Sequence, residues 1–317
     1  MIQSATPTRE HVYRHSAFDS SRWDAFKPRD DDIIICTSYK AGTTWMQMIC
    51  ALLVFQKTNL DRPLTTISPW LDLVAEPIED VLAAYEAQRH RRFIKTHTAL
   101  DGLPYVDNVT YLYCGRDPRD VFMSLLNHLA NASPEMRALL RPQQDVAVDE
   151  LPEMPSDINE MFQLWLTTGS FPWEQDGFPF WSHLNHARTY WEFRHYPNVH
   201  LLHYADLKAD LGVQMRNIAD LLNVEVPEAL WPGLVAAATF EHMKSNADQL
   251  APDVDHGVSW WKDNSRFFNR GTSGQWQGAL SEESLELYER VKRERMEPAL
   301  ADWLERGSLA AGDPTAL

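Results

Sequence analysis

The chain has 317 residues, 44% of them hydrophobic and 23% charged, which is enough for one large domain or two modest ones with a full core. Its formal net charge of −16 argues against general nucleic-acid binding, because such binding depends on lysine and arginine neutralising phosphates. A small anionic ligand is not excluded, since the local field of a cleft governs its binding, whatever the net charge.

The N-terminal segment, MIQSATPTREHVYRHS, has no apolar core of the kind that secretory signals carry. The longest apolar stretch, residues 45–55, is interrupted by Gln47 and is too short to span a bilayer. We therefore expect a soluble, cytoplasmic protein without a membrane-spanning segment.

The first predicted unit of structure contains an unusual glycine loop. A β-branched run at 31–37 predicts a buried strand, and apolar residues at helical spacing predict a helix over 43–55. Between them lies CTSYKAGTTW. Strand, glycine loop and helix in this order open a nucleotide-binding α/β domain, but Lys40 precedes Gly42, whereas the lysine of a Walker A loop follows the last glycine.

Three further strands are predicted along the chain, over 92–97, 110–115 and 199–204. Helices are predicted near 120–131 and from about 207 to 222. Strands that alternate with helices indicate an α/β fold whose central sheet is mostly parallel and flanked by helices.

Residues 132–185 differ in character from these units, because prolines and acidic residues are followed by a cluster of aromatics. We interpret them as an insertion that folds over the sheet within a single domain spanning 1–317. The aromatics fit ordinary core packing as well as an apolar substrate lid. A final helix is predicted after Ser281, with acidic residues first and basic residues late, as suits the helix dipole.

Polar side chains follow all four predicted strands. Ligands of doubly wound sheets bind beyond the carboxyl ends of the strands, so these side chains are expected to meet at one rim. They comprise three cations, one imidazole and one phenol: Lys40, Lys95, His97, Arg116 and Tyr204.

The glycine loop has the features of a phosphate-binding site. Backbone N–H groups of residues 41–44, including Ala41 and Gly42, would cradle a phosphate at the start of a helix. Thr43 and Thr44 add hydroxyl donors, Lys40 adds a charge and Trp45 offers a face for a purine. On its own, the segment fits a plain helix start with a core tryptophan equally well.

Five motifs, in this order, resemble those of the cytosolic-type sulfotransferases, which use 3′-phosphoadenosine 5′-phosphosulfate (PAPS). They are TSYKAGTTW, FIKTH, GRDPRDVFMSLLNH, HYADLK and FFNRGTSGQW, and the similarity runs from about Ile33 to Trp276. The segments DIIIC, SPWLD and RRFIKTHT look most like the actinobacterial glycolipid and aryl branch. The resemblance implies a P-loop-NTPase-like three-layer fold, PAPS as co-substrate and adenosine 3′,5′-bisphosphate as product.

The resemblance implies catalytic roles for residues of the first two motifs. Lys40 would lie beside the oxygen that bridges phosphate and sulfuryl group and neutralise charge as that bond breaks. His97 would be the general base that takes the proton of the acceptor hydroxyl. Lys95, on the same side of its strand as His97, would stabilise the sulfuryl oxygens.

The resemblance also implies contacts with the nucleotide. Arg116 and Ser124, eight residues apart, match the pair that binds the 3′-phosphate, and Ser124 would also modulate Lys40. Tyr204, Phe240 and Met243 match residues around the adenine, although each also fits ordinary core packing. Arg119 and Asp120 are interpreted as surface or capping residues.

The C-terminal loop departs from the family pattern R-K-G-x-x-G-D-W. Arg270 and Gly271 carry over, but Asn269 stands where the family has arginine and Gln275 where it has aspartate. Asparagine donates a hydrogen bond but supplies no charge. Either nucleotide affinity is lower, or Arg266 compensates for the missing charge.

The acceptor is less defined than the reaction. Aromatics at 165–181, with Trp260 and Trp261, indicate an apolar pocket for the hydroxyl of a phenol, an alcohol or a glycolipid. The sequence does not indicate an oligomeric state.

No metal is expected, because the three cysteines form no C-x-x-C pair and no D-x-D motif or ligand-spaced cluster occurs. Two alternatives remain at this point. A P-loop nucleotide kinase would bind ATP with Mg²⁺, but the chain has no Gly-Lys dipeptide. A non-catalytic homologue would bind the nucleotide product without turnover.

Overall fold

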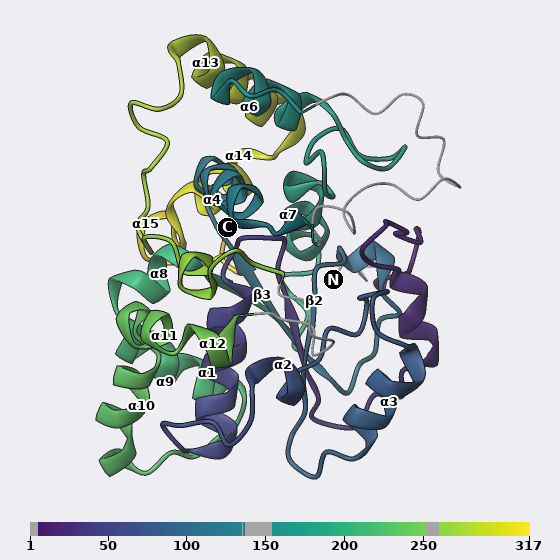
Figure 1. Cartoon of the computed structure of the whole chain (residues 1–317), viewed down its shortest axis with the longest axis vertical. Helices are drawn as coiled ribbons and strands as arrows, with labels where there is room; N and C mark the ends of the chain where they lie inside the picture. The colour runs from purple at the N-terminus through teal and green to yellow at the C-terminus, as the bar shows by residue number, and fades with distance from the viewer. Residues whose placement is uncertain (1–5, 135, 137–153, 252–259) are drawn as a thin grey trace.

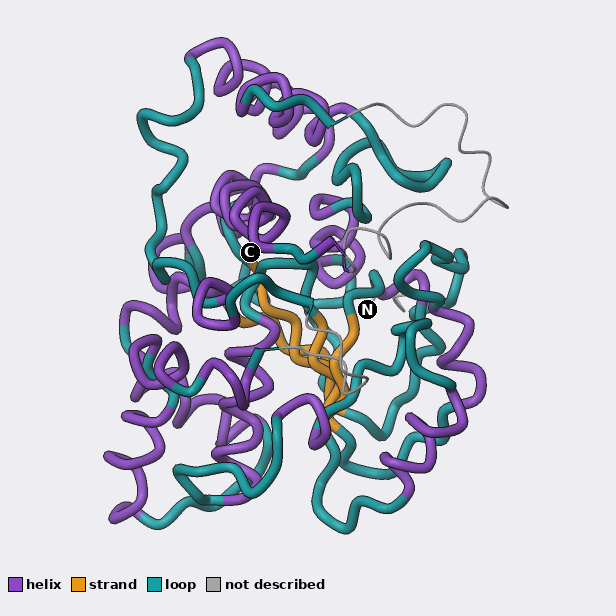
Figure 2. The backbone as a smooth tube through the Cα atoms, viewed as in Figure 1, coloured by secondary structure: helices purple, strands orange, loops and turns teal. Residues whose placement is uncertain are grey.

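The computed structural model describes residues 6–134, 136, 154–251 and 260–317. Its centre is a four-stranded sheet in the order β2-β1-β3-β4, with every neighbouring pair parallel. The strands are β1 (Ile33–Cys36), β2 (Phe93–Thr96), β3 (Thr110–Gly115) and β4 (Val199–His203). Figure 2 shows them at the centre of the molecule, enclosed by helices and loops. The predicted parallel sheet is confirmed.

The sheet is buried on both faces, and most positions of its strands carry apolar residues. In β1, Ile34 and Cys36 join one hydrophobic core, whereas Ile33 and Ile35 join the other. This is the period-two alternation expected of a strand. The two cores make the molecule a three-layer α/β structure.

Different helices cover the two faces (Figure 1). The core on one face contains α1 (Thr43–Phe55), α9 (Leu211–Leu221) and α10 (Trp231–Ala237). The core on the other face contains α4 (Pro118–Asn131), α6 (Ile158–Thr167), α7 (His183–Trp191), α13 (Glu282–Arg295) and α14 (Pro298–Arg306). The shorter helices are α2 (Leu64–Ile67), α3 (Ile78–Glu86), α8 (Tyr204–Ala209), α11 (Phe240–Ser245), α12 (Ala247–Leu250) and α15 (Ser308–Ala311). No helix in the described ranges is long and apolar enough to cross a bilayer.

Three boundaries differ from the sequence prediction. The helix predicted over 207–222 is two helices, because Asp210 leaves the helical conformation and its side chain caps α9 by accepting a hydrogen bond from the Val213 amide at 2.9 Å. Ser281 does cap α13, but this helix is not the last, since Pro298 starts α14. The helix predicted near 120–131 begins slightly earlier, at Pro118 of α4.

The predicted insertion at 132–185 lies partly outside the described residues, so its role as a lid stays a prediction. The part that the structure describes packs into the same core as the sheet. Trp165 is fully buried, and its indole donates to the Tyr39 hydroxyl at 2.7 Å. Phe180 and Trp181 are buried as well, and they also line the cavity described below.

Candidate active site

A cavity of about 580 Å³ opens at the carboxyl ends of the strands. Each strand contributes a polar residue at or just beyond its end, as the sequence predicted: Lys40, His97, Arg116 and Tyr204 all line the cavity. The lining also includes the other residues expected to bind the nucleotide or act on it: Gly42, Thr43, Thr44, Trp45, Lys95, Ser124, Phe240, Met243, Asn269, Arg270 and Gly271. Ala41 is the exception, because it is fully buried and its amide donates to the Ser38 carbonyl.

The glycine loop leaves the amide donors at the start of α1 available. Lys40 and Gly42 both have positive φ, 60° and 106°, so the chain turns sharply into the helix. A Cβ at Gly42 would lie 3.2 Å from the Tyr204 ring, and the backbone conformation there favours glycine as well. Gly42 is the N-cap and offers no side chain to the first amides of α1. These amides, with the positive end of the helix dipole, form an anion site.

Lys40 lies at the junction between this loop and an aromatic part of the wall. Its Nζ is 3.0 Å from Nδ1 of His128 and 4.6 Å from the centre of the Phe267 ring. Burial, and next to it the charge of Arg116, lowers the pKa of Lys40 to about 7. The enclosed, basic surroundings thus disfavour the ammonium, and a bound anion would favour it again.

His97 follows β2 and carries an imidazole whose tautomer is set by a backbone contact. Its Nδ1 is 2.9 Å from the Thr37 carbonyl, which can only accept, so Nδ1 donates and Nε2 keeps the lone pair. Burial, then the charges of Lys95 and Lys40, lowers the pKa of His97 to about 3. The ring is therefore neutral near pH 7 and able to accept a proton.

Lys95 lies two residues before His97 and points into the same cavity. Its Nζ is 5.1 Å from the centre of the Trp70 ring, and the same ring packs edge-on against His97 at 5.0 Å. Burial lowers the pKa of Lys95 to about 8. Trp70 therefore contacts both titratable groups.

Asp72 links the end of β2 to Trp70 through hydrogen bonds. The sequence did not indicate this role. The carboxylate is fully buried and accepts hydrogen bonds from the hydroxyls of Thr96 and Thr98, at 2.6 and 3.2 Å, and from the indoles of Trp23 and Trp70. Burial raises its pKa to about 6 even so. The residue lies in the SPWLD segment, which gave a family resemblance but no role.

Arg116 is oriented from two sides. Its guanidinium lies 4.1 Å above the Tyr204 ring, and Nη1 donates to the Lys40 carbonyl at 2.7 Å. Its Nε is buried without a partner among the described residues. A buried guanidinium with an unused donor beside a helix N-terminus fits a phosphate. Ser124 lies on α4, two turns further along.

Aromatic side chains line the cavity next to Arg116. The Trp45 indole packs edge-on against Tyr204 at 5.2 Å and donates to the Ala238 carbonyl at 2.8 Å. A Cβ at Gly271 would lie only 2.6 Å from the Phe240 ring, so this close approach requires glycine. Met243 is 2% exposed; it belongs to the hydrophobic core and also lines the cavity.

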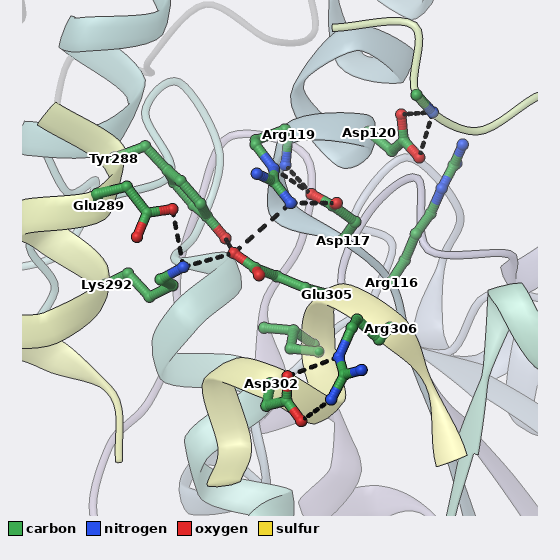
Figure 3. Close-up of polar contacts among 12 residues, drawn as sticks. Arg116, Asp117, Arg119, Asp120, Tyr288, Glu289, Lys292, Asp302, Glu305 and Arg306 are labelled. Atoms are coloured by element: carbon green, nitrogen blue, oxygen red, sulfur yellow. Dashed lines mark hydrogen bonds and ion pairs between the residues drawn. The ribbon is translucent and has the colours of Figure 1, made fainter. Parts of the chain in front are cut away.

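The loop that carries Asn269 and Arg270 is tied to α4 by Asp120. The Gly274 amide donates to both carboxylate oxygens of Asp120, at 2.8 and 3.1 Å (Figure 3). Asp120 is buried, and Asp117 caps the helix, so the interpretation of Asp120 as a surface or capping residue is wrong. The motif GRDPRDVFMSLLNH includes Asp120, but nothing in it indicates that Asp120 bonds the loop at Gly274.

Arg119 is likewise not a surface residue. It pairs with Asp117 at 2.8 Å and with Glu305 of α14 at 3.5 Å, and it lies over the Trp276 ring at 4.1 Å. Glu305 in turn accepts from the Tyr288 hydroxyl and from a lysine of α13 (Figure 3). Helices α13 and α14 thereby support the first turn of α4, next to Arg116.

Beyond His97, the cavity wall is mostly aromatic and apolar. This part contains Trp70, Leu73, Met136, Phe180, Trp181, Trp260, Trp261 and Phe267. The cavity thus joins a basic, amide-rich end to an apolar end, with His97 and Lys40 between them.

Comparisons with known proteins identify the family. A family model described as a sulfotransferase domain matches residues 30–299. The glycolipid sulfotransferase of Mycobacterium bovis is 39% identical over 93% of this chain and 94% of its own length. The chain belongs to the sulfotransferase family. It is therefore a sulfotransferase, an enzyme that moves a sulfuryl group from PAPS to an acceptor, and the kinase alternative no longer applies.

Solved structures agree on the fold of this sulfotransferase. Mouse sulfotransferase SULT7A1 complexed with PAP superposes with a TM-score of 0.64, at 17% identity, over 90% of this chain and 95% of that one. Retinol dehydratase in a complex with retinol and PAP superposes with a TM-score of 0.64, at 19% identity, over 89% of this chain and 87% of that one. The predicted P-loop-like three-layer fold is confirmed.

Proposed function

We propose that this sulfotransferase sulfates a hydroxyl of an apolar, lipid-like acceptor, with His97 as the general base. The observation that carries the proposal is the position of His97. Its unprotonated Nε2 belongs to a cavity with an anion-binding loop at one end and aromatic side chains at the other. A base placed there lies between a nucleotide donor and an apolar alcohol.

The residues of the basic end fit the donor. The amides at the start of α1 would hold the 5′-phosphosulfate, and Arg116, with its unused Nε, would hold the 3′-phosphate together with Ser124, Asn269 and Arg270. Trp45, Tyr204, Phe240 and Met243 would enclose the adenine. When bound, PAPS supplies an electrophilic sulfur and a phosphate leaving group. Gly42 and Gly271 allow the chain to approach the nucleotide closely.

The chain's own groups would then act on protons and charge. His97 Nε2 takes the proton from the acceptor hydroxyl, which makes the oxygen a better nucleophile. Lys40 neutralises the oxygen that leaves, and Lys95 neutralises the sulfuryl oxygens. The anionic donor offsets the two ammonium groups that depress the pKa of His97, so this pKa is expected to rise in the complex.

The acceptor end supports an apolar alcohol. Its aromatic wall would bury a phenol ring or the first part of a lipid chain and leave the hydroxyl at His97. The relatives at 39% identity are described as glycolipid sulfotransferases, which fits a hydroxyl on a lipid-bearing molecule. Residues 132–185 contribute Phe180 and Trp181 to this wall and are proposed to cover the bound acceptor.

Calorimetry tests the nucleotide assignment. Adenosine 3′,5′-bisphosphate is expected to bind, whereas ATP with Mg²⁺ is not. Arg116→Ala should weaken the bisphosphate about 10- to 100-fold, because hydrogen bonds to a charged group contribute about 1.5–3 kcal/mol. Arg216→Ala is the matched control, since Arg216 is an exposed arginine paired with Glu228. Binding of ATP alone would refute the assignment.

A transfer assay tests the acceptor class. Radiolabelled PAPS is supplied with a phenol, a long-chain alcohol and a glycolipid, and the sulfated products are separated by chromatography. Turnover of the apolar alcohols above a water-soluble sugar is expected. Bisphosphate binding without turnover of any of them would support the non-catalytic alternative instead.

Asp120→Ala tests the anchoring of the C-terminal loop. Loss of the two contacts to the Gly274 amide should free the loop that carries Arg270 and lower bisphosphate affinity about 10-fold. Asp120→Asn keeps one acceptor oxygen and should lose less. Asp302→Ala, which removes a surface pair with Arg306, serves as the control. Equal affinities in all of these variants would contradict the role of Asp120.

A further inference from the structure

His128 is an imidazole of the cavity that sequence reasoning did not identify. It lies on α4, four residues after Ser124, and its Nδ1 is 3.0 Å from Lys40 Nζ. Its ring lies 4.5 Å from Trp261 and 5.9 Å from Phe267. His128 therefore contacts the lysine of the donor end and the aromatic wall of the acceptor end at once.

The 3.0 Å contact fits a hydrogen bond from the Lys40 ammonium to Nδ1 of His128. A protonated lysine only donates, so in that state Nδ1 of His128 carries the lone pair and the N–H is on Nε2. Burial, followed by the charges of Lys40 and His97, holds the pKa of His128 well below its ordinary value. The ring is therefore neutral near pH 7, and its Nδ1 can accept from a protonated Lys40.

Lys40 has few other groups that would favour its charged form. Arg116 just beyond β3 and Lys95 on β2 are both cations, and His97 is neutral. The segment 260–268 carries Lys262, Asp263 and Arg266, which are all exposed, and the Asp120 carboxylate of α4 bonds Gly274. Among the residues that the structure describes, no carboxylate pairs with Lys40. The His128 lone pair is its nearest stabilising partner.

We propose that His128 is a positioning residue for sulfuryl transfer: it accepts a hydrogen bond from Lys40, keeps that lysine protonated, and holds its ammonium where donor and acceptor meet. The inference rests on the proposed function, because it gives a purpose to the charge of Lys40. It explains how a lysine that is enclosed beside an arginine can still meet an anionic donor as a cation.

The test is the pH dependence of adenosine 3′,5′-bisphosphate affinity between pH 6 and pH 9. Removing the acceptor in His128→Phe lowers the pKa of Lys40, so affinity should begin to fall at a pH about one unit lower than in the wild type. At pH 8 this is about a 10-fold weaker affinity, while at pH 6 the two proteins should agree within about twofold. His128→Gln, whose amide oxygen accepts, should restore the wild-type profile.

A second background separates this role from a structural one. In Lys40→Arg the guanidinium stays charged throughout, so adding His128→Phe should not move the pH profile. A profile unmoved in His128→Phe, or moved equally in the Lys40→Arg background, would overturn the inference while the proposed function stands. Failure of the wild type to bind the bisphosphate would overturn the proposed function and the inference together. Thermal unfolding of each variant confirms that folded protein is compared.

Discussion

Replacing His97 by alanine is expected to lower kcat for sulfuryl transfer by about 10²- to 10⁴-fold, the usual contribution of a positioned general base. Affinity for adenosine 3′,5′-bisphosphate should stay within about threefold of the wild type. The reason is that His97 bonds the Thr37 carbonyl and is not one of the groups proposed to hold the phosphates. The measurement combines single-turnover kinetics with calorimetry on the same preparation. Loss of rate without loss of binding is the signature of a group that acts in the transition state.

The pH profile adds a second readout for His97. Because its pKa is about 3 in the free enzyme, kcat/KM should show no acid limb near the ordinary histidine pKa of about 6.5. His195→Ala is the matched control, since His195 is exposed. A His97→Ala variant that keeps most of its kcat, or that loses rate and nucleotide binding in parallel, would rule out the role of base.

Lys40→Met is expected to lower kcat by about 10²- to 10³-fold, the scale found for removal of one group that stabilises a developing oxyanion. The methionine keeps the length and the contact with Phe267 but has no charge. Unlike the His97 variant, this one should also bind the bisphosphate more weakly, because Lys40 belongs to the phosphate loop.

Proton uptake on binding reports the change in charge of Lys40. Its pKa is about 7 in the free enzyme, and a bound anion raises it. Affinity should therefore fall as pH rises through 7, and binding at pH 8 should take up a proton. Calorimetry in buffers of different ionisation enthalpy measures this uptake. Lys40→Met should reduce it to the share of Lys95, whose pKa of about 8 also lets it gain a proton. Lys57→Met, at an exposed pair with Asp61, should behave as wild type, and uptake undiminished in Lys40→Met would contradict the assignment.

Strands and loop were predictable because their signals are local. The isoleucines of 33–35 read as a strand buried on both faces, and the glycine before Thr43 marks where α1 begins. The rule that ligands bind beyond the carboxyl ends of parallel strands then placed Lys40, His97 and Arg116 at one rim. In each case, the nature of a few consecutive residues decides the conformation.

The errors came where one helix meets a distant segment. Asp120 and Arg119 have the composition of an exposed first turn, yet they bond Gly274 and Glu305, which are more than 150 residues away. The error at Asp210 was local, because its side chain caps a new helix and interrupts a continuous apolar pattern. The spacing of apolar residues along a helix does not indicate which distant segment will pack against its polar face.

The sequence by itself determined the parallel sheet, the anion-binding loop and the family motifs, because each depends on residues that are neighbours in the chain. Only the tertiary structure decided the electrostatics of the site. Asp72, which holds the Lys95–His97 strand, and His128, which bonds Lys40 from 88 residues away, have no local pattern that marks them. Their effects depend on burial and on distances across elements, since a pKa responds to the groups that surround it in space.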